Sequence, residues 1–286
     1  MASLKAIRAR IKTAKNIQQI TRAMKLVAAA RLKKATDRVL EARPYSEKLR
    51  ELMLSMSAAG ELPPHPLMAK RPVERYALIL ITAERGLAGS YNTSLIRKAA
   101  DFVKETPGEP FLVTVGKKGT TFFGKRGFRM GPTHTVPTAG ARLEDAVQVT
   151  QIARELYVSG EVDAVYICYS KFYSAIRQVP QVVQLLPIEP PASEEPGSAA
   201  GDVIFEPSPA ELLNTLLPRY FQGLVWQAML EATASEHGAR MTAMTSATDN
   251  AGKMIQNLTL KANRERQAGI TKEILEVVSG AEALNA

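Results

Sequence analysis

One short segment of the sequence has the residue spacing of a phosphate-binding loop. Gly119, Gly124 and Lys125 match the pattern GxxxxGK, in which backbone N–H groups and a lysine hold nucleotide phosphates. The next residue is Arg126, so the Ser or Thr hydroxyl that binds Mg²⁺ in such loops is absent. The match also falls inside a helix-like stretch, whereas a phosphate loop directly follows a strand. We therefore expect no working nucleotide site here.

Other glycines and histidines that could serve a cofactor or a metal are scattered. The segment ERGLAGSYN contains Gly86 and Gly89, which suit a tight turn but do not form the GxGxxG pattern of dinucleotide sites. His65, His134 and His237 fall in a Pro-rich linker, a loop and a long helix, and their spacing does not suit a metal site. The sequence therefore predicts no cofactor and no metal.

The candidate acid, base and nucleophile side chains fit structural roles better than catalytic ones. His237 follows Glu236 on a helix, which is typical of a solvated or interface pair. Ser170 and Ser174 lack the nucleophile-elbow pattern. Cys168 lies in an apolar run, where we interpret it as a small buried hydrophobe. The chain is therefore expected to be noncatalytic on its own.

The composition is that of a folded protein whose charge is unevenly placed. Of the 286 residues, 45% are hydrophobic and 23% are charged, which is ordinary for a soluble domain. Residues 1–50 hold 14 Lys and Arg against 3 Asp and Glu, so this segment carries +11 while the whole chain carries +9. Such a basic face attracts nucleic acid, anionic lipid or an acidic protein surface.

The sequence contains no apolar run that approaches the roughly 18 to 20 residues of a membrane span. The N-terminus, MASLKAIRAR, lacks the apolar core of a signal peptide. We therefore expect a cytosolic chain, or one that is held at a membrane through its partners and has no direct span.

The sequence divides into two long terminal helices and a segment between them, and these elements must position the candidate residues named above. From Ser3 to Ser57 the only helix breaker is Pro44, which predicts a helix over 1–58. Four prolines within Gly60–Pro72 end it. Its irregular steps of three and four predict irregular supercoiling rather than a strict zipper. Its predicted apolar stripe is Ile7, Ile11, Ala14, Ile17, Ile20, Met24 and Val27.

The middle segment, 73–190, alternates short apolar strands with helices. This alternation predicts a Rossmann-like parallel sheet covered on both faces. The expected strands are Tyr76–Thr82, Phe111–Val115 and Val162–Ser170, with a further one at Gln181, and the expected helices are Thr93–Lys104, Lys117–Lys125 and Leu143–Ser159.

After a loop rich in Pro and Gly around Pro190–Gly201, residues 209–286 predict a second long helix. At 1.5 Å per residue it would reach roughly 110 Å, so it needs a partner helix along its apolar stripe. We predict an α/β chain with a long antiparallel two-helix coiled coil of the N- and C-terminal helices and the sheet domain inserted between them. The stripe is Met241, Met244, Thr248, Ala251, Ile255, Leu258 and Ala262, and Gly223, Gly238, Gly252 and Gly269 are expected to mark close contacts or flexible points.

Three regions resemble the γ subunits of F-type ATP synthases. They are the C-terminal helix from SEHGARM onward, the N-terminal KAIRARIKTAKNIQQITRAMKLVAAARL and the segment ITAERGLAGSYN. Glu84 and Ala88 depart from the usual Asp and Cys of that family. The end of the chain fits the family spacing I-T-x-E-x-x-E-x-x-x-G-A-x-A with Ile270, Thr271, Glu273, Glu276, Gly280, Ala281 and Ala283.

The resemblance implies a rotor shaft that carries torque between the proton-driven c-ring and the catalytic head. It implies α and β subunits around the coiled coil, ε and the c-ring at the sheet domain, and a peripheral position at the cytoplasmic face of a bacterial plasma membrane. Expected contacts with the head are Arg8, Arg10, Lys25, Arg240, Arg266, Gln267, Thr271 and Glu273. Ile274, Leu275, Val277 and Val278 are expected to run in an apolar sleeve.

Two alternative functions remain open from the residues. One is a basic coiled-coil protein that binds nucleic acid or acts as a scaffold. Tyr45 is the only aromatic residue before Tyr76, which disfavours binding by base stacking. The other is a nucleotide-dependent enzyme with a helical arm, and the incomplete phosphate motif disfavours it. We expect no binding of nucleic acid and no ATP hydrolysis by the isolated chain.

Overall fold

The computed structural model describes residues 4–58, 62–137, 140–190 and 208–284. By their contacts the residues form two units, which we describe separately: Ala28–Arg240, and Met1–Val27 with Met241–Ala286. The long helices α1 (Leu4–Ala58) and α5 (Pro209–Leu284) contribute to both units. Pro44 and Pro218 lie inside these helices, so neither proline ends its helix. Most of the predicted loop after Pro190 lies outside the described residues.

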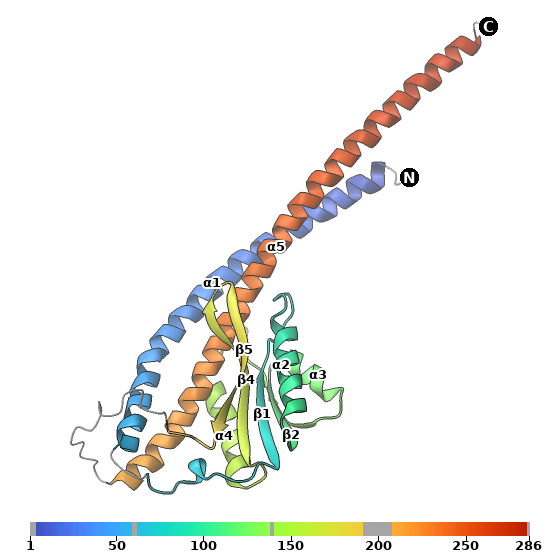
Figure 1. Cartoon of the computed structure of the whole chain (residues 1–286). Helices are drawn as coiled ribbons and strands as arrows, with labels where there is room; N and C mark the ends of the chain where they lie inside the picture. Colours follow the sequence, from blue (N-terminus) through green and yellow to red (C-terminus); the bar gives the residue numbers. More distant parts are fainter. Residues whose placement is uncertain (1–3, 59–61, 138–139, 191–207, 285–286) are drawn as a thin grey trace. The chain divides into compact units, whose positions relative to one another are not determined.

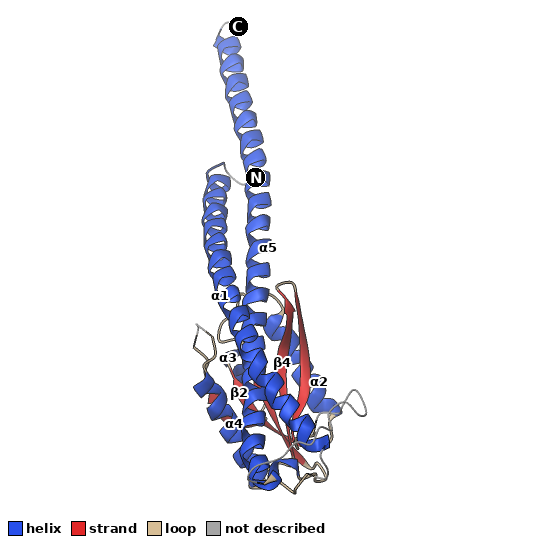
Figure 2. Ribbon diagram, turned by 90° about the vertical axis from the view of Figure 1, so that its left-hand side faces the viewer, coloured by secondary structure: helices blue, strands red, loops and turns tan. Residues whose placement is uncertain are grey.

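A five-stranded sheet forms the centre of the Ala28–Arg240 unit. The strands are β1 (Arg75–Ile81), β2 (Glu109–Val115), β3 (Arg129–His134), β4 (Ala164–Ser174) and β5 (Arg177–Leu186), in the order β3-β2-β1-β4-β5. The first four run parallel to one another, and β5 runs antiparallel to β4 in a long hairpin (Figure 2). The predicted α/β fold with a Rossmann-like sheet is therefore confirmed.

Strand β3 is the one strand of the described sheet that the sequence did not predict. Its residues RMGPTH include Gly131 and Pro132, which are rare inside strands. Proline is tolerated here because β3 lies at the edge of the sheet, where one side needs no ladder hydrogen bonds. A side chain at Gly131 would come within 2.6 Å of the Phe111 ring, so the close approach of β2 explains the glycine.

Helices cover both faces of the sheet, as predicted (Figure 1). Alternate residues of a strand point to opposite faces, and β1 therefore serves two cores. Tyr76, Leu78 and Leu80 pack with α2 (Tyr91–Glu105) and α3 (Lys117–Gly124). Ala77 and Ile79 face the second core.

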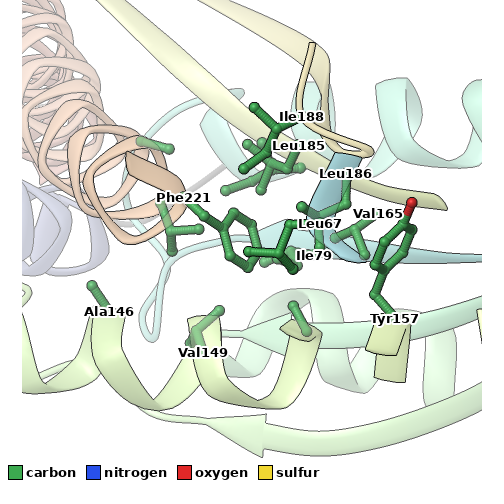
Figure 3. Close-up of a cluster of buried hydrophobic side chains, with 14 of the residues drawn as sticks. Leu67, Ile79, Ala146, Val149, Tyr157, Val165, Leu185, Leu186, Ile188 and Phe221 are labelled. Atoms are coloured by element: carbon green, nitrogen blue, oxygen red, sulfur yellow. The ribbon is translucent and has the colours of Figure 1, made fainter. Parts of the chain in front are cut away.

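That second core joins α4 (Leu143–Val158) to parts of both long helices and to the short 3₁₀ turn η1 (Pro66–Met68). Figure 3 shows Phe221 of α5 lying between Val149 of α4 and residues of the sheet. Leu49 and Met53 add side chains from α1. The two long helices are thus part of the folded α/β unit through these segments, because they supply buried core residues to it.

In the other unit, the ends of α1 and α5 pair as an antiparallel coiled coil. The Thr248 hydroxyl donates to the Thr21 hydroxyl at 2.9 Å. A side chain at Gly252 would lie 3.1 Å from Nε2 of Gln18. The residue numbers in contact thus rise along α5 as they fall along α1, so the two helices run in opposite directions. All seven predicted stripe residues of α5 are buried or half-buried, which confirms that stripe.

The predicted stripe on α1 is wrong in part. Ile17, Ile20 and Val27 are 48%, 60% and 51% exposed. Burial instead recurs every seven residues, at Ile7, Ala14 and Thr21, in the strict heptad that we did not expect. The seam includes polar positions, which an apolar pattern does not reveal, and the Thr21 hydroxyl is satisfied there by Thr248.

Three of the four α5 glycines singled out from the sequence lie at close contacts, as expected. A side chain at Gly223 would lie 3.3 Å from Leu49, and those at Gly238 and Gly252 would also meet atoms within 3.4 Å. Gly269 has nothing within 4 Å of such a position, so no contact requires a glycine there.

Candidate functional site

The segment Ala232–Arg240 of α5, which we call the anchor segment, is fixed to the α/β fold by hydrogen bonds from two elements. The Tyr91 hydroxyl, at the start of α2, donates to the Ala232 carbonyl at 3.1 Å. The Ser235 hydroxyl donates to the Ser170 carbonyl of β4 at 2.9 Å. Tyr91 is 6% exposed and Ser235 is fully buried, so water does not compete for these bonds.

The helix backbone also comes close to the turn between β4 and β5. A side chain at Gly238 would lie 3.3 Å from the Ala175 carbonyl oxygen and 3.4 Å from its Cα atom. Only a residue without a Cβ allows this approach without displacement. Neither hydroxyl donor, Tyr91 or Ser235, was predicted as an anchor from the sequence, because hydrogen bonds to backbone carbonyls leave no residue pattern.

A charged cluster lies at the C-terminal end of the anchor segment. Arg240 pairs with Glu236 one turn earlier at 2.6 Å, and both side chains are largely buried. The same guanidinium nitrogen, Nη2, also donates to the Gly86 carbonyl at 3.3 Å. Burial raises the pKa of Glu236, and the charge of Arg240 opposes that rise. Arg240 therefore joins α5 to the loop that follows β1.

The loop that receives Arg240 is itself held in place by side chains near its two ends. Asn92 accepts a hydrogen bond from the Ala83 N–H at 2.9 Å. Glu84 accepts one from the Val136 N–H at 3.1 Å. Leu87, between them, has a positive φ of 62°, which marks a tight turn for a residue that is not glycine. The ERGLAGSYN segment thus forms the predicted turn, and it receives Arg240 of α5.

His237 is buried, which excludes the solvated one of the two predicted roles, a solvated or an interface pair. It is 4% exposed, and its ring Nδ1 lies 3.4 Å from a guanidinium nitrogen of Arg240. Since arginine only donates, Nδ1 must act as an acceptor and the ring must be neutral. Burial, together with the charges of Arg240 and Arg31, lowers the pKa of His237 to about 4.

This neutral histidine predicts a loss of stability in mild acid. Its pKa of about 4 in the folded chain lies below the ordinary value near 6.5, so below pH 6.5 the unfolded chain binds the proton more readily. We expect the free energy of unfolding to fall by about 2 kcal/mol between pH 7 and pH 5 through this residue. Glu236, whose pKa is raised, opposes part of that change.

The measurement is urea unfolding of the chain at pH 7 and pH 5, compared with the variant His237→Gln. The variant keeps a neutral polar side chain, so its stability should fall less over the same interval. Equal losses in both proteins would show that His237 does not cause the acid sensitivity.

The residues that suggested other chemistry are used for packing. The Gly119 N–H donates to the Thr82 hydroxyl at 2.9 Å inside α3, so the GxxxxGK segment is helical, as expected, and this amide is occupied. Cys168 is fully buried, as predicted, and burial raises its pKa to about 12. His134 pairs with Asp145 at 2.9 Å. Within the described part of the chain, no group of three His, Cys, Asp or Glu could hold a metal.

The predicted head contacts fall into different environments. Arg8 and Arg10 are exposed on α1, whereas Lys25 is half-buried near the coiled-coil seam. Arg240 belongs to the Ala28–Arg240 unit and is engaged in the anchor cluster. The remaining four, Arg266, Gln267, Thr271 and Glu273, are exposed along one stretch of α5, where the Thr271 hydroxyl donates to the Gln267 carbonyl at 3.0 Å.

The last described part of α5 has no helix beside it in its unit. Figures 1 and 2 show α5 continuing beyond the N-terminal end of α1. Every residue from Arg266 to Ala281 is exposed. The predicted apolar bearing, Ile274, Leu275, Val277 and Val278, is 57%, 60%, 71% and 54% exposed. So much exposed apolar surface on one helix is typical of a binding surface.

The chain is similar to proteins of one family over almost its whole length. Residues 3–284 match the family model described as ATP synthase. The chain is 46% identical to the ATP synthase gamma chain of Pelotomaculum thermopropionicum and 47% identical to that of Moorella thermoacetica, over 99% of this chain and 100% of each relative. A chain of the mitochondrial ATP synthase of Euglena gracilis superposes with a TM-score of 0.70 at 19% identity, over 98% of this chain and 94% of that chain, which shows a shared fold.

Proposed function

This chain belongs to the ATP synthase gamma-chain family, the noncatalytic central shaft of the complex, and we propose which of its surfaces meet the other subunits. The single observation that carries the proposal is the exposed stretch Arg266–Ala281 of α5. It combines polar side chains with an apolar face and lacks a partner helix. Such a helix requires a surrounding protein surface, and a ring of α and β subunits supplies one.

The basic face of α1 provides a second contact with the head. Arg8 and Arg10 are exposed, and residues 1–50 carry a net charge of +11. Complementary acidic surfaces on the catalytic subunits would attract this face at long range without deep interlocking. Contacts of this kind suit a shaft that must leave one subunit and meet the next.

The α/β domain, residues 73–190, is the proposed foot, which binds ε and the c-ring. Among the described helices, none has both the length and the apolar character to cross a membrane. Association with the membrane would therefore come through the partner subunits, with the chain peripheral at the cytoplasmic face of a bacterial plasma membrane. The division into 1–58, 73–190 and 209–286 is proposed as the functional one, with a shaft helix on either side of a foot.

Charge reversal at Arg266 tests the head contact. Because Arg266 is exposed, Arg266→Glu should change the free energy of unfolding by less than about 0.5 kcal/mol. We expect it to lower ATP synthesis by the assembled complex by about fivefold or more, which corresponds to roughly 1 kcal/mol of lost interaction. Lys253→Glu makes the same charge change at another exposed position of α5 and should leave synthesis unchanged. Equal losses of stability and synthesis would favour a merely structural role for Arg266.

Assembly provides the direct test of the function itself. The isolated chain should hydrolyse no ATP, whereas mixing it with α and β subunits should yield a stable ATPase that purifies at fixed stoichiometry. Robust hydrolysis by the pure chain, or failure to join the larger subunits, would contradict the shaft assignment.

A further inference from the structure

We propose that the anchor segment, Ala232–Arg240, is the joint that transmits torque between α5 and the foot, and that it occupies the crevice that α/β sheets usually offer to a ligand. This inference rests on the proposed shaft function and deepens it by assigning residues to one mechanical step.

The first observation is where the sheet reverses its order. The chain builds outward from β1 through β2 to β3 and then returns to place β4 on the other side of β1. In open α/β sheets, ligands bind outside the carboxyl ends of the strands at such a switch point. In this sheet the switch point lies between β1 and β4.

The second observation is that α5 is bonded to both sides of that switch point. Tyr91, which holds the Ala232 carbonyl, begins the helix that follows β1. Ser170, which receives the Ser235 hydroxyl, lies in β4 two residues past Cys168, the last β4 residue paired with β1. The helix therefore lies where a nucleotide would otherwise bind, which explains why this fold lacks a complete phosphate motif.

The third observation is the tight backbone contact one turn further along. Gly238 meets the β4–β5 turn at Ala175, and Arg240 reaches the carbonyl of Gly86 in the loop after β1. Turning α5 about its axis would break the buried bonds to both α2 and β4 and drive the helix into the turn. Desolvated bonds of this kind resist such motion better than exposed ones. The joint is therefore rigid during turnover.

The experiment loosens the joint in the assembled complex, reconstituted in proteoliposomes. The variant Tyr91→Phe with Ser235→Ala removes both buried hydroxyl bonds. We expect amide exchange in residues 232–240 to become about tenfold faster and protons pumped per ATP hydrolysed to fall. The control, Tyr45→Phe with Ser246→Ala, removes the same groups from exposed positions and should change neither quantity.

A reversible cross-link then distinguishes a torque-bearing joint from a general effect on folding. A Cβ atom at Gly238 would lie 3.4 Å from Cα of Ala175, so the two Cα atoms are at most about 5 Å apart, which is near enough for two cysteines to join. Gly238→Cys with Ala175→Cys should form a disulfide, and the buried Cys168 should not compete for it. Oxidation should restore pumping in the loosened variant that carries the two cysteines. In a complex that carries only the two cysteines, pumping should be the same before and after oxidation.

Three results would overturn the joint. They are normal pumping by the loosened variant despite faster exchange, a disulfide that reversibly stops turnover, and failure of the two cysteines to join. Failure of the shaft function itself would look different, because the unsubstituted chain would then not assemble or pump at all.

Discussion

Replacing Arg240 with Glu is expected to lower the free energy of unfolding of the chain by about 3 kcal/mol. The guanidinium is 2.6 Å from the carboxylate of Glu236, with side-chain exposures of only 13% and 23%. The substitution would leave Glu236 largely buried without its cation and would place a second carboxylate beside it. It would also turn an acceptor towards the Gly86 carbonyl, which now receives a hydrogen bond. Urea unfolding at pH 7 measures the loss.

Arg240→Lys is the matched control for that prediction. Lysine keeps the charge but not the planar guanidinium, whose Nη2 contacts both Glu236 and Gly86 while Nη1 lies beside His237. We therefore expect a loss of about 1 kcal/mol. A loss below about 1 kcal/mol for Arg240→Glu would show that the pair is solvated. Because Arg240 is largely buried, we expect its charge reversal to lower stability and coupled turnover together, unlike charge reversal at the exposed Arg266.

Replacing Gly116 with Ala is expected to lower the free energy of unfolding by about 3 kcal/mol or more. Gly116 precedes α3 with a φ of +93°, a region that L side chains rarely adopt. Its added Cβ would lie 2.1 Å from the Thr82 carbonyl oxygen, so the ends of β1 and β2 would have to separate. Thermal or urea unfolding of the variant measures the effect.

Gly127→Ala separates backbone strain from collision. Gly127 also has a positive φ, of +73°, but nothing lies within 4 Å of its would-be Cβ. We expect a loss of about 1 kcal/mol from strain alone. Similar losses in the two variants would show that the contact between Gly116 and Thr82 adds nothing.

Local patterns along the chain predicted the main elements of this fold. The long C-terminal helix, its stripe and the alternation of strands with helices all follow from periodicity, because neighbouring residues of one element face one core. Strand β3 lacks the apolar pattern of a buried strand. It lies at the edge of the sheet, includes Gly131 and Pro132, and is mostly exposed or half-buried. The predicted apolar stripe of α1 was partly wrong because Thr21, which is polar, belongs to the buried seam and bonds Thr248 there. A search for apolar residues passes over it.

The sequence by itself determined the family of the chain and the exposed candidate residues at the end of α5, because these are contiguous and have recognisable spacing. Only the tertiary structure decided that Arg240 and His237 are buried and that α5 is bonded to the sheet at its switch point. Arg240 and Gly86 are 154 residues apart, and Ser235 and Ser170 are 65 apart. The acceptor in each pair is a backbone carbonyl, which every residue possesses, so only folding selects which one is used.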